Sequence, residues 1–205
     1  MSTISPAENK NQVSIICRTL GRPELQQALQ SIASQDYPNI EIVLVDATGK
    51  QSIDSTASGD RPLEFVTTGS ALGRSAAANA GLEAAHGKYI QFLDDDDWID
   101  PSHVSQLVST LESSYETAAV YSSTQKTNAA GDSLDYVFRE AFDPILLMRD
   151  NYIPIHSLLF DSALLEHGCR FDETFDIYED WDFWLQLSQY TNFQHIDSIT
   201  AYYRE

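Results

Sequence analysis

The chain has 205 residues, of which 42% are hydrophobic and 11% aromatic, enough to bury the core of one sizeable domain. Its 12 lysines and arginines against 31 aspartates and glutamates give a net charge of −19, so the overall field repels a nucleic-acid polymer and an anionic membrane surface. Cys17 and Cys169 lie far apart without CxxC spacing, which argues against a disulfide framework or a structural zinc site and predicts two buried thiols. With no signal-like N-terminus and no apolar run of membrane-spanning length, we expect a cytosolic protein.

The first half alternates short β-branched runs with segments of helical period. We expect a polar, disordered leader over residues 1–11 and one domain over residues 12–205. The predicted strands are VSIICR (13–18), IEIVLV (40–45) and KYIQFL (88–93), and the predicted helices are PELQQALQSIASQ (23–35) and SAAANAGLEAAHG (75–87). This alternation predicts an α/β fold with an open, mostly parallel sheet flanked by helices, and a ligand site beyond the carboxyl ends of the strands.

The second half is less regular. A helix is expected over residues 100–114, strands over 117–124 and 153–160, an amphipathic helix within 172–190 and a strand over 195–205.

Four consecutive carboxylates, Asp94 to Asp97, follow the predicted strand at 88–93. Adjacent carboxylates repel one another unless a cation or several backbone donors face them. Hard oxygen ligands suit Mg²⁺ or Mn²⁺, which makes Asp94 and Asp96 candidate metal ligands in a nucleotide-diphosphate site. The alternative is a solvated acidic turn that caps the helix starting near Pro101.

Two further residues adjoin the predicted ligand edge. Asp46 closes a buried strand, so it is a candidate to accept hydrogen bonds from a ribose or base, and an Asx turn is the alternative. Arg74 opens the alanine-rich helix, whose free backbone N–H groups favour an anion such as a diphosphate. A surface salt bridge is the alternative for Arg74.

The YEDWD stretch contains a candidate general base. Asp180 lies between aromatic residues, where burial raises a carboxylate pKa. The alternative is an acidic first turn of a helix, which interacts favourably with the helix dipole. His156 lies in an apolar run, where a lone histidine is more often a core residue than a ligand.

The order and spacing of these segments resemble the family 2 inverting glycosyltransferases with the GT-A fold, from Val13 to Arg204. The segments that carry the resemblance are VSIICRTLGRPELQQALQSIASQDYPNIEIVLVD, GRSAAANAGLEAAHGKYIQFLDDDDW, HSLLF and GCRFDETFDIYEDWDFWLQL. The resemblance implies a Rossmann-like, nucleotide-sugar-binding half over residues 12–100 and an acceptor-binding half over residues 101–205.

The resemblance also implies roles for individual residues. The implied donor-binding residues are Thr19, Asp46, Arg74, Asn79, Asp94 and Asp95, and the implied metal ligands are Asp96 and Asp94. Asp180 matches the family's catalytic base, with Asp182 as the fallback. His156, Glu179 and Trp181 are acceptor-side candidates.

The implied function is transfer of a sugar, with inversion and with Mn²⁺ or Mg²⁺, from a nucleotide diphosphate to an acceptor hydroxyl in polysaccharide, lipopolysaccharide or other glycoconjugate biosynthesis. The expected partners are the nucleotide-sugar and a carbohydrate or lipid-linked acceptor, with transient contact at the cytoplasmic face of a membrane if the acceptor is lipid-linked. Ala47 stands where the family usually has a second acid, so the nucleoside stays open.

Two other functions are weighed against glycosyl transfer. A catalytically silent nucleotide-sugar-binding module or partner subunit would share the donor contacts. A nucleotidyltransferase would share the acidic metal ligands, but no glycine-rich, lysine-bearing loop follows the first predicted strand.

Overall fold

The computed structural model describes residues 11–50, 53–114 and 116–205, so the predicted leader lies outside the described residues except for Asn11. The strands are β1 (Val13–Thr19), β2 (Ile40–Asp46), β3 (Leu63–Thr67), β4 (Tyr89–Asp94), β5 (Trp98–Ile99), β6 (Thr117–Thr127), β7 (Ser133–Phe138), β8 (Leu158–Asp161) and β9 (Asn192–Arg204). The α-helices are α1 (Leu25–Ala33), α2 (Arg74–Ala84), α3 (His103–Ser113), α4 (Pro144–Leu147) and α5 (Glu179–Leu187). Short 3₁₀ helices are η1 (Thr56–Ser58), η2 (Ile155–Ser157) and η3 (Ser162–His167).

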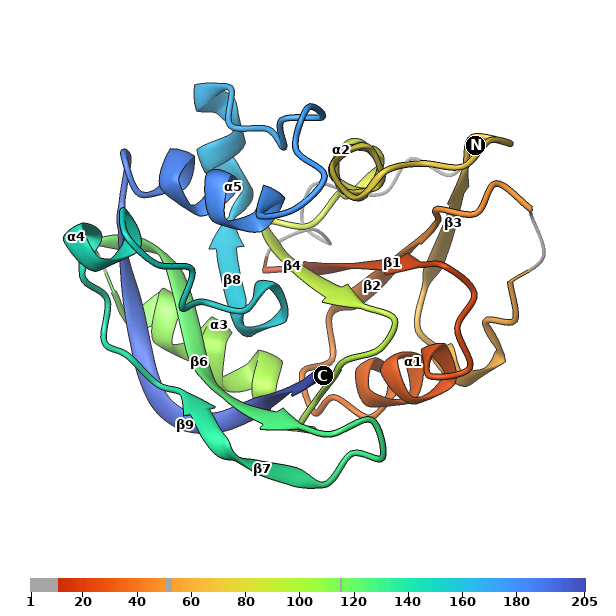
Figure 1. The fold of residues 1–205 in the computed structure, drawn as a ribbon, viewed down its shortest axis with the longest axis horizontal. Helices are drawn as coiled ribbons and strands as arrows, with labels where there is room; N and C mark the ends of the chain where they lie inside the picture. The colour runs from red at the N-terminus through yellow and green to blue at the C-terminus, as the bar shows by residue number, and fades with distance from the viewer. Residues whose placement is uncertain (1–10, 51–52, 115) are drawn as a thin grey trace.

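One sheet runs through both halves of the chain, in the order β3-β2-β1-β4-β8-β6-β9-β5, with β7 paired to β6 (Figure 1). The four strands β3, β2, β1 and β4 are parallel, as the sequence predicts. The second half departs from the predicted, mostly parallel arrangement because β8 is antiparallel to both β4 and β6, and β5 and β7 also pair antiparallel with their neighbours.

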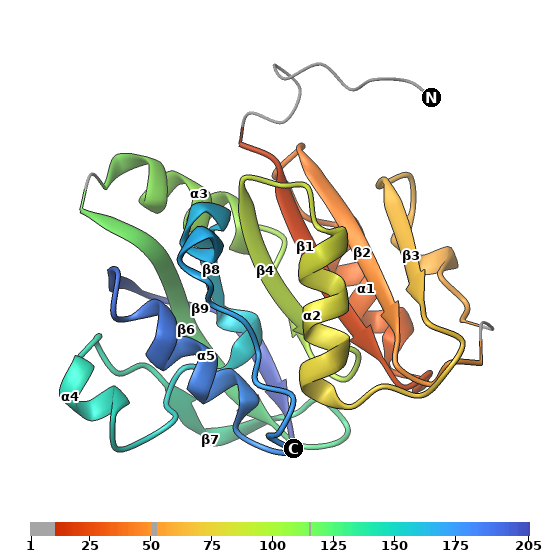
Figure 2. The same cartoon turned by 90° about the horizontal axis from the view of Figure 1, so that it is seen from above.

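Helices cover both faces of the sheet, as Figure 2 shows. On one face, α2 and α5 pack on side chains such as Ile16 and Phe92. On the other face, α1 and α3 pack on Ile15 and Leu93. Successive residues of a strand point to opposite faces, so strands buried on both sides become the continuous apolar runs that identify β1, β2 and β4 in the sequence.

One predicted strand is shorter in the structure. Of the strand expected over residues 153–160, only β8 forms, because Pro154 has no N–H for a ladder and its carbonyl instead accepts a hydrogen bond from the Ser157 N–H in η2. The amphipathic helix expected within residues 172–190 is confirmed as α5, which begins at Glu179 after Tyr178 in the left-handed region at φ 63°.

The two cysteines are buried thiols, as the composition predicts. Cys17 and Cys169 are both unpaired. Within the described residues, none of the helices is both long and apolar enough to cross a bilayer.

Helix α2 approaches the sheet closely at Gly81. A Cβ atom at Gly81 would lie 2.3 Å from Ile16 Cγ2 and 3.2 Å from Val45 Cγ2. Gly81→Ala should therefore lower the free energy of unfolding, because overpacking costs about 1–3 kcal/mol and the gain in helix propensity returns at most about 1 kcal/mol. Urea denaturation measures the change. The matched control is Gly73→Ala, where no atom lies within 4 Å; equal stability of both variants would contradict the close packing.

Candidate active site

The carboxyl ends of β1, β2 and β4 meet at one edge of the sheet. The register aligns Thr19 with Asp46 and Arg18 with Asp94. The sequence prediction that the ends carrying Asp46 and the acidic run share one edge is therefore confirmed. The side chains at this edge nevertheless point in different directions and have different partners.

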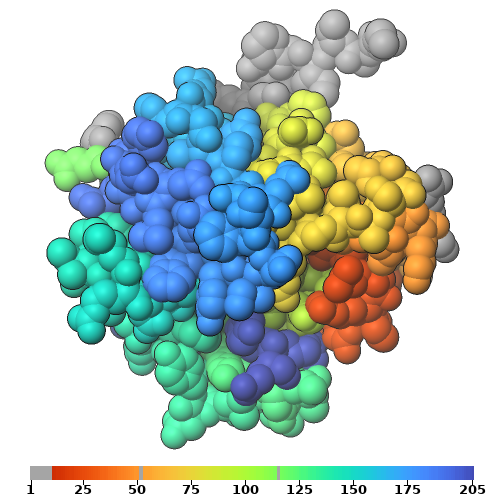
Figure 3. Space-filling model, turned by 45° about the horizontal axis from the view of Figure 1, so that its top comes forward, coloured from red at the N-terminus to blue at the C-terminus, as the bar shows by residue number. Residues whose placement is uncertain are grey.

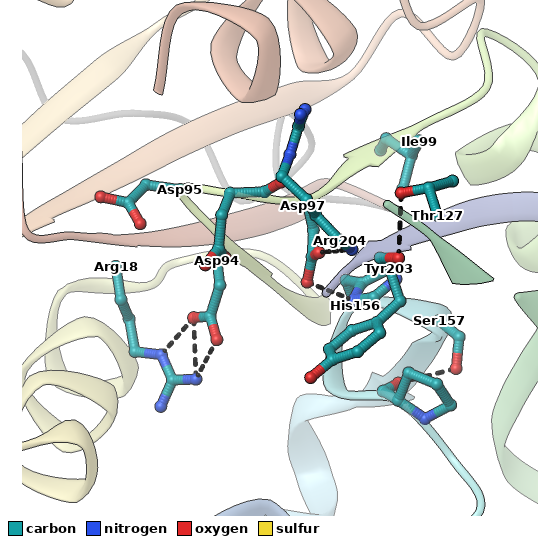
Figure 4. Close-up of polar contacts among 12 residues, drawn as sticks. Arg18, Asp94, Asp95, Asp97, Ile99, Thr127, His156, Ser157, Tyr203 and Arg204 are labelled. Atoms are coloured by element: carbon teal, nitrogen blue, oxygen red, sulfur yellow. Dashed lines mark hydrogen bonds and ion pairs between the residues drawn. The ribbon is translucent and has the colours of Figure 1, made fainter. Parts of the chain in front are cut away.

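Arg18 is the group that faces Asp94. Its Nε lies 2.8 Å from Asp94 Oδ1 and its Nη2 lies 2.9 Å from Oδ2, a two-pronged contact (Figure 4). Its Nη1 lies 3.2 Å from Oε1 of the buried Glu179. Burial alone would raise the pKa of Asp94, but the Arg18 guanidinium outweighs burial and holds that pKa below its ordinary value. The same carboxylates raise the pKa of Arg18 against the opposing effect of burial.

Asp95 and Asp97 are held by other protein donors. Asp95 accepts hydrogen bonds from the Thr19 hydroxyl at 2.7 Å and the Leu20 N–H at 2.8 Å, and pairs with Arg22 at 2.8 Å. Asp97 accepts from the Arg204 N–H at 2.8 Å and lies 3.0 Å from His156 Nδ1. Figure 4 shows the Asp94 side chain directed at Arg18 and the Asp97 side chain directed at His156, with the Asp95 side chain pointing away from both.

Asp96 differs from its neighbours. Within the described residues, its side chain has Arg22 as its sole hydrogen-bonding partner, at 2.6 Å, and remains 33% exposed. Burial, with the charges of Asp97 and Asp94, raises the pKa of Asp96 to about 6. Negative potential at Asp96 is therefore only partly compensated by the protein.

The partners of each aspartate in the acidic run determine which of them could hold a divalent metal ion. Across residues 11–50, 53–114 and 116–205, no three or more histidine, cysteine, aspartate or glutamate side chains form a cluster suited to a metal ion. Mg²⁺ and Mn²⁺ at nucleotide sites are commonly held by one or two carboxylates together with substrate phosphates. Asp96 suits such a site because its carboxylate is partly exposed and under-compensated. The Asp94 carboxylate, in contrast, is occupied by Arg18 at both oxygens.

A smaller pocket opens between β1 and the start of α2, with about 400 Å³ of space including its mouth. Both polar and apolar residues line it: Arg18, Thr19, Leu20, Arg22, Ala47, Leu72, Arg74, Ala77, Asp94 and Asp95. Thr19, Arg74, Asp94 and Asp95, which the sequence assigns to the donor site, are thus brought together.

Asp46 and Asn79 lie outside this pocket. Asp46 is fully buried, and its Oδ1 accepts from the Thr48 N–H at 2.8 Å, which is the Asx-turn alternative. The Asn79 amide exchanges hydrogen bonds with the backbone of Phe171 at 2.9 and 3.0 Å, so it fixes the segment that leads to α5. The protein itself thus provides partners for both side chains, and a role for either in donor binding stays a prediction.

A larger pocket adjoins the first, with about 1130 Å³ of space including its mouth. The turn after β1, the start of α2, the loop before α5 and the end of β9 meet on this face of the molecule (Figure 3). Its lining includes the predicted residues Asp94, His156, Glu179, Asp180 and Arg74, together with Arg18, Asp97, Lys126, Phe138, Asn151, Pro154, Ile155, Ile177, Tyr178 and Tyr203. Arg18, Arg74 and Asp94 line both pockets.

In the first turn of α5, Asp180 lines the larger pocket, whereas Trp181 and Asp182 do not. Asp180 lines the larger pocket and accepts hydrogen bonds from the Asn151 side chain and the Trp181 N–H. Burial is the main cause that raises the pKa of Asp180. Asp182 instead accepts from Gln186 at 2.7 Å and does not line the pocket, and Trp181 donates its indole N–H to the Leu147 carbonyl. The geometry therefore favours Asp180 over the fallback and takes Trp181 away from the acceptor side.

Sequence reasoning missed the residues that neutralise the acidic run. Arg18, Arg22 and Arg204 all contact it, and Asn151 contacts Asp180. Arg18 carries a usable signal, because a charged residue within an otherwise buried strand needs a partner on a neighbouring strand. The register that identifies this partner as Asp94 comes only with the structure.

Removing Arg18 should leave the buried Glu179 and the partly exposed Asp94 without their positive partner. Arg18→Met should therefore reduce the free energy of unfolding by about 3–5 kcal/mol, the usual cost of breaking a buried pair on one side. The control is Arg139→Met, whose partner Asp197 is 65% exposed, so that its loss should cost far less than the loss of Arg18. Guanidinium denaturation of both variants compares them, and similar stabilities would overturn the importance given to Arg18.

Curated proteins similar to this chain include two that are named as glycosyltransferases. The chain is 27% identical over 184 residues to the uncharacterized glycosyltransferase YwdF of Bacillus subtilis, which covers 87% of this chain and 68% of YwdF. It is 40% identical over 88 residues to glycosyltransferase GlyA of Streptococcus pneumoniae, which covers 40% of this chain and 12% of GlyA.

Two solved structures share the fold. TarS of S. aureus in complex with UDP-GlcNAc aligns with a TM-score of 0.75 at 19% identity, over 95% of this chain and 58% of that chain. The mannosyltransferase PcManGT of Pyrobaculum calidifontis, in complex with GDP-Man and Mn²⁺, aligns with a TM-score of 0.68 at 18% identity, over 98% of this chain and 59% of that chain. The predicted GT-A fold is thus confirmed, and the chain spans little more than half of these solved chains. Since the family model described as glycosyl transferase family 2 also matches residues 14–168, the chain belongs to glycosyl transferase family 2.

Proposed function

We propose that this protein transfers a sugar from a nucleotide-diphosphate donor to an acceptor hydroxyl, with inversion and with a divalent metal ion. One observation carries the proposal. The smaller pocket and the larger pocket share Arg18, Arg74 and Asp94, so a donor in the first would present its sugar to the second, where Asp180 lies. Such adjoining sites suit a two-substrate transfer.

The smaller pocket supplies groups suited to a nucleoside diphosphate. Thr19 and Leu20 provide one wall for the nucleoside, and Arg74 provides a positive charge for the diphosphate. Arg74 also stands at the start of α2, where free backbone N–H groups and the helix dipole favour an anion. Its side chain is 61% exposed and therefore accessible to a ligand.

Asp96 is the residue that would hold Mg²⁺ or Mn²⁺, together with the donor phosphates; it lines neither pocket itself, but Arg22, which lines the smaller pocket, contacts its carboxylate at 2.6 Å. The ion, when bound, supplies positive charge to the diphosphate leaving group. Asp94 retains Arg18 as its partner, which orients that arginine between the two pockets. The match to a mannosyltransferase structure that contains Mn²⁺ and GDP-Man supports use of a divalent ion in this fold.

Asp180 is the proposed general base. Inversion requires a group that takes the proton of the acceptor hydroxyl while its oxygen attacks the anomeric carbon from the side opposite the leaving diphosphate. Asp180 faces the larger pocket, and its raised pKa makes it a stronger proton acceptor than an ordinary aspartate. Glu179 is paired with Arg18 and is less suited to this task.

The substrates belong to the classes that the family implies. We propose a carbohydrate or lipid-linked acceptor, in glycoconjugate biosynthesis at the cytoplasmic side of a membrane. UDP-GlcNAc and GDP-mannose are the first donors to test, because they occupy the two related structures. A panel of UDP-, GDP-, CMP- and dTDP-sugars in a thermal-shift assay extends the search, since a donor raises the melting temperature according to its affinity.

Donor binding should depend on the metal and on Asp96. Asp96→Asn removes the charge but keeps the shape, so the thermal shift produced by donor and Mn²⁺ together should fall to that produced without metal. The control is Asp132→Asn in the exposed hairpin between β6 and β7, which should keep the full shift. An undiminished metal-dependent shift in Asp96→Asn would exclude Asp96 as the metal ligand.

Turnover should depend on Asp180. Asp180→Asn keeps the side-chain shape but cannot take a proton, so release of nucleoside diphosphate should slow by about 10²–10⁴-fold with donor affinity unchanged. Asp182→Asn should turn over like wild type, because Asp182 faces Gln186 instead of the pocket. If Asp180→Asn is fully active, the base lies elsewhere; if wild type binds donors but transfers none, the silent binding module is the better account.

A further inference from the structure

Asn151 makes a two-sided contact with the proposed base. It lies between α4 and η2 and lines the larger pocket. Its Nδ2 lies 3.1 Å from Asp180 Oδ1 and 3.2 Å from Oδ2. The Trp181 N–H adds a further hydrogen bond to Oδ1 at 2.8 Å. The carboxylate is therefore held at both oxygens by neutral donors.

The orientation of the Asn151 amide follows from this contact. An ionised carboxylate only accepts hydrogen bonds, so the NH₂ end of the amide must face Asp180. The other end, Oδ1, is then buried without a hydrogen-bond partner among the described residues. Burying a polar oxygen without a partner is unfavourable, so an amide selected for stability alone would use both of its ends. Asn151 uses only the end directed at Asp180.

We propose that Asn151 is a positioning residue for the transfer reaction. Asn151 fixes the orientation of the Asp180 carboxylate toward the acceptor and favours the ionised form of that carboxylate. This inference rests on the proposed role of Asp180 as base. Asn151 does not exchange protons and need not touch the reacting atoms. Its contribution is to fix two rotatable bonds of Asp180 before the acceptor arrives, which lowers the barrier by preorganisation.

Asn151 is a neutral donor to Asp180 among many charged groups, and it lowers the pKa of Asp180. Titratable and charged groups reach the larger pocket from several elements: Arg18 with Asp94, Arg74, Asp97 with His156, Lys126, Tyr178, Glu179 and Tyr203. Burial is the largest effect and raises the pKa of Asp180, Glu179 raises it further, and Asn151, the Trp181 N–H and Arg18 lower it. Without Asn151 the pKa of Asp180 should be higher still, so the base would become protonated, and inactive, at a higher pH.

Two variants and a matched control test the inference. Asn151→Ala removes the amide, and Asn151→Asp keeps the shape while placing a like charge beside Asp180. The control is Gln186→Ala, which removes the amide that contacts Asp182 on the side of α5 outside the pocket. Two measurements are made: release of nucleoside diphosphate from UDP-GlcNAc and GDP-mannose with Mn²⁺ across pH, and the pKa of Asp180 from carboxyl ¹³C NMR, assigned with Asp180→Asn.

The expected result is a shift of the acidic limb of the rate profile, and of the NMR titration, to higher pH by about 1–2 units in Asn151→Ala, with a larger shift in Asn151→Asp. The donor KM should stay constant while kcat falls by about tenfold or more at neutral pH. Gln186→Ala should move neither quantity. The inference is overturned if Asp180 titrates at the same pH in wild type and in a soluble Asn151→Ala or Asn151→Asp variant.

The NMR measurement needs no turnover, so the two proposals fail separately. If wild type cleaves donor and Asp180→Asn does not, but both Asn151 variants match wild type, then only the positioning role is wrong. If Asp180→Asn cleaves donor as fast as wild type, then the base assignment is wrong and the positioning role falls with it.

Discussion

The buried contact between Arg18 and Asp94 is the interaction on which the site depends. It joins β1 to β4 at the point where both strands end, and Glu179 extends it to the first turn of α5. A guanidinium with 6% exposure would be very unfavourable without these partners, so the three residues fix one another's positions. The helix that carries Asp180 is thereby tied to the centre of the sheet.

This contact also explains why four adjacent carboxylates are tolerated. Asp94, Asp95 and Asp97 each face a different set of donors, so only Asp96 keeps part of its charge uncompensated. The protein as a whole is strongly acidic, yet five of its 12 lysines and arginines lie at the site: Arg18, Arg22, Arg74, Lys126 and Arg204. These cations offset the six carboxylates of the site, Asp94 to Asp97, Glu179 and Asp180, so the cleft is far less negative than a chain of net charge −19, which is unfavourable to extended polyanions.

The sequence predicts the strands that are buried on both faces, because these strands appear as continuous apolar runs. β1, β2 and β4 are apolar on both faces and were recognisable as runs, whereas β7 has mostly exposed or half-buried residues and gives no such signal. Pro154 shortened a predicted strand, and the antiparallel β8 could not be inferred because pairing direction depends on contacts between distant segments.

Within the site, residue type was more predictable than partner. Thr19, Arg74 and Asp180 line the pockets as the sequence suggests, but Asp46 satisfies its own turn. The position at which α5 begins decides whether Asp180 or Asp182 faces the pocket. A start shifted by one residue would change that choice, and the sequence does not fix the start to one residue. Asn151 was invisible to sequence reasoning because it lies 29 residues from Asp180 in an irregular segment.

The acidic run is divided: Asp94, Asp95 and Asp97 are each held by two or more protein donors, whereas Asp96 contacts Arg22 through one oxygen and is the proposed metal ligand. Anomalous diffraction from crystals grown with Mn²⁺ and a nucleoside diphosphate measures this directly. The account predicts a manganese peak beside the Asp96 carboxylate, with Arg18 still paired to both oxygens of Asp94. Manganese bound by Asp94 or Asp95 with its arginine displaced, or bound nucleotide with no manganese at the acidic run, would contradict it.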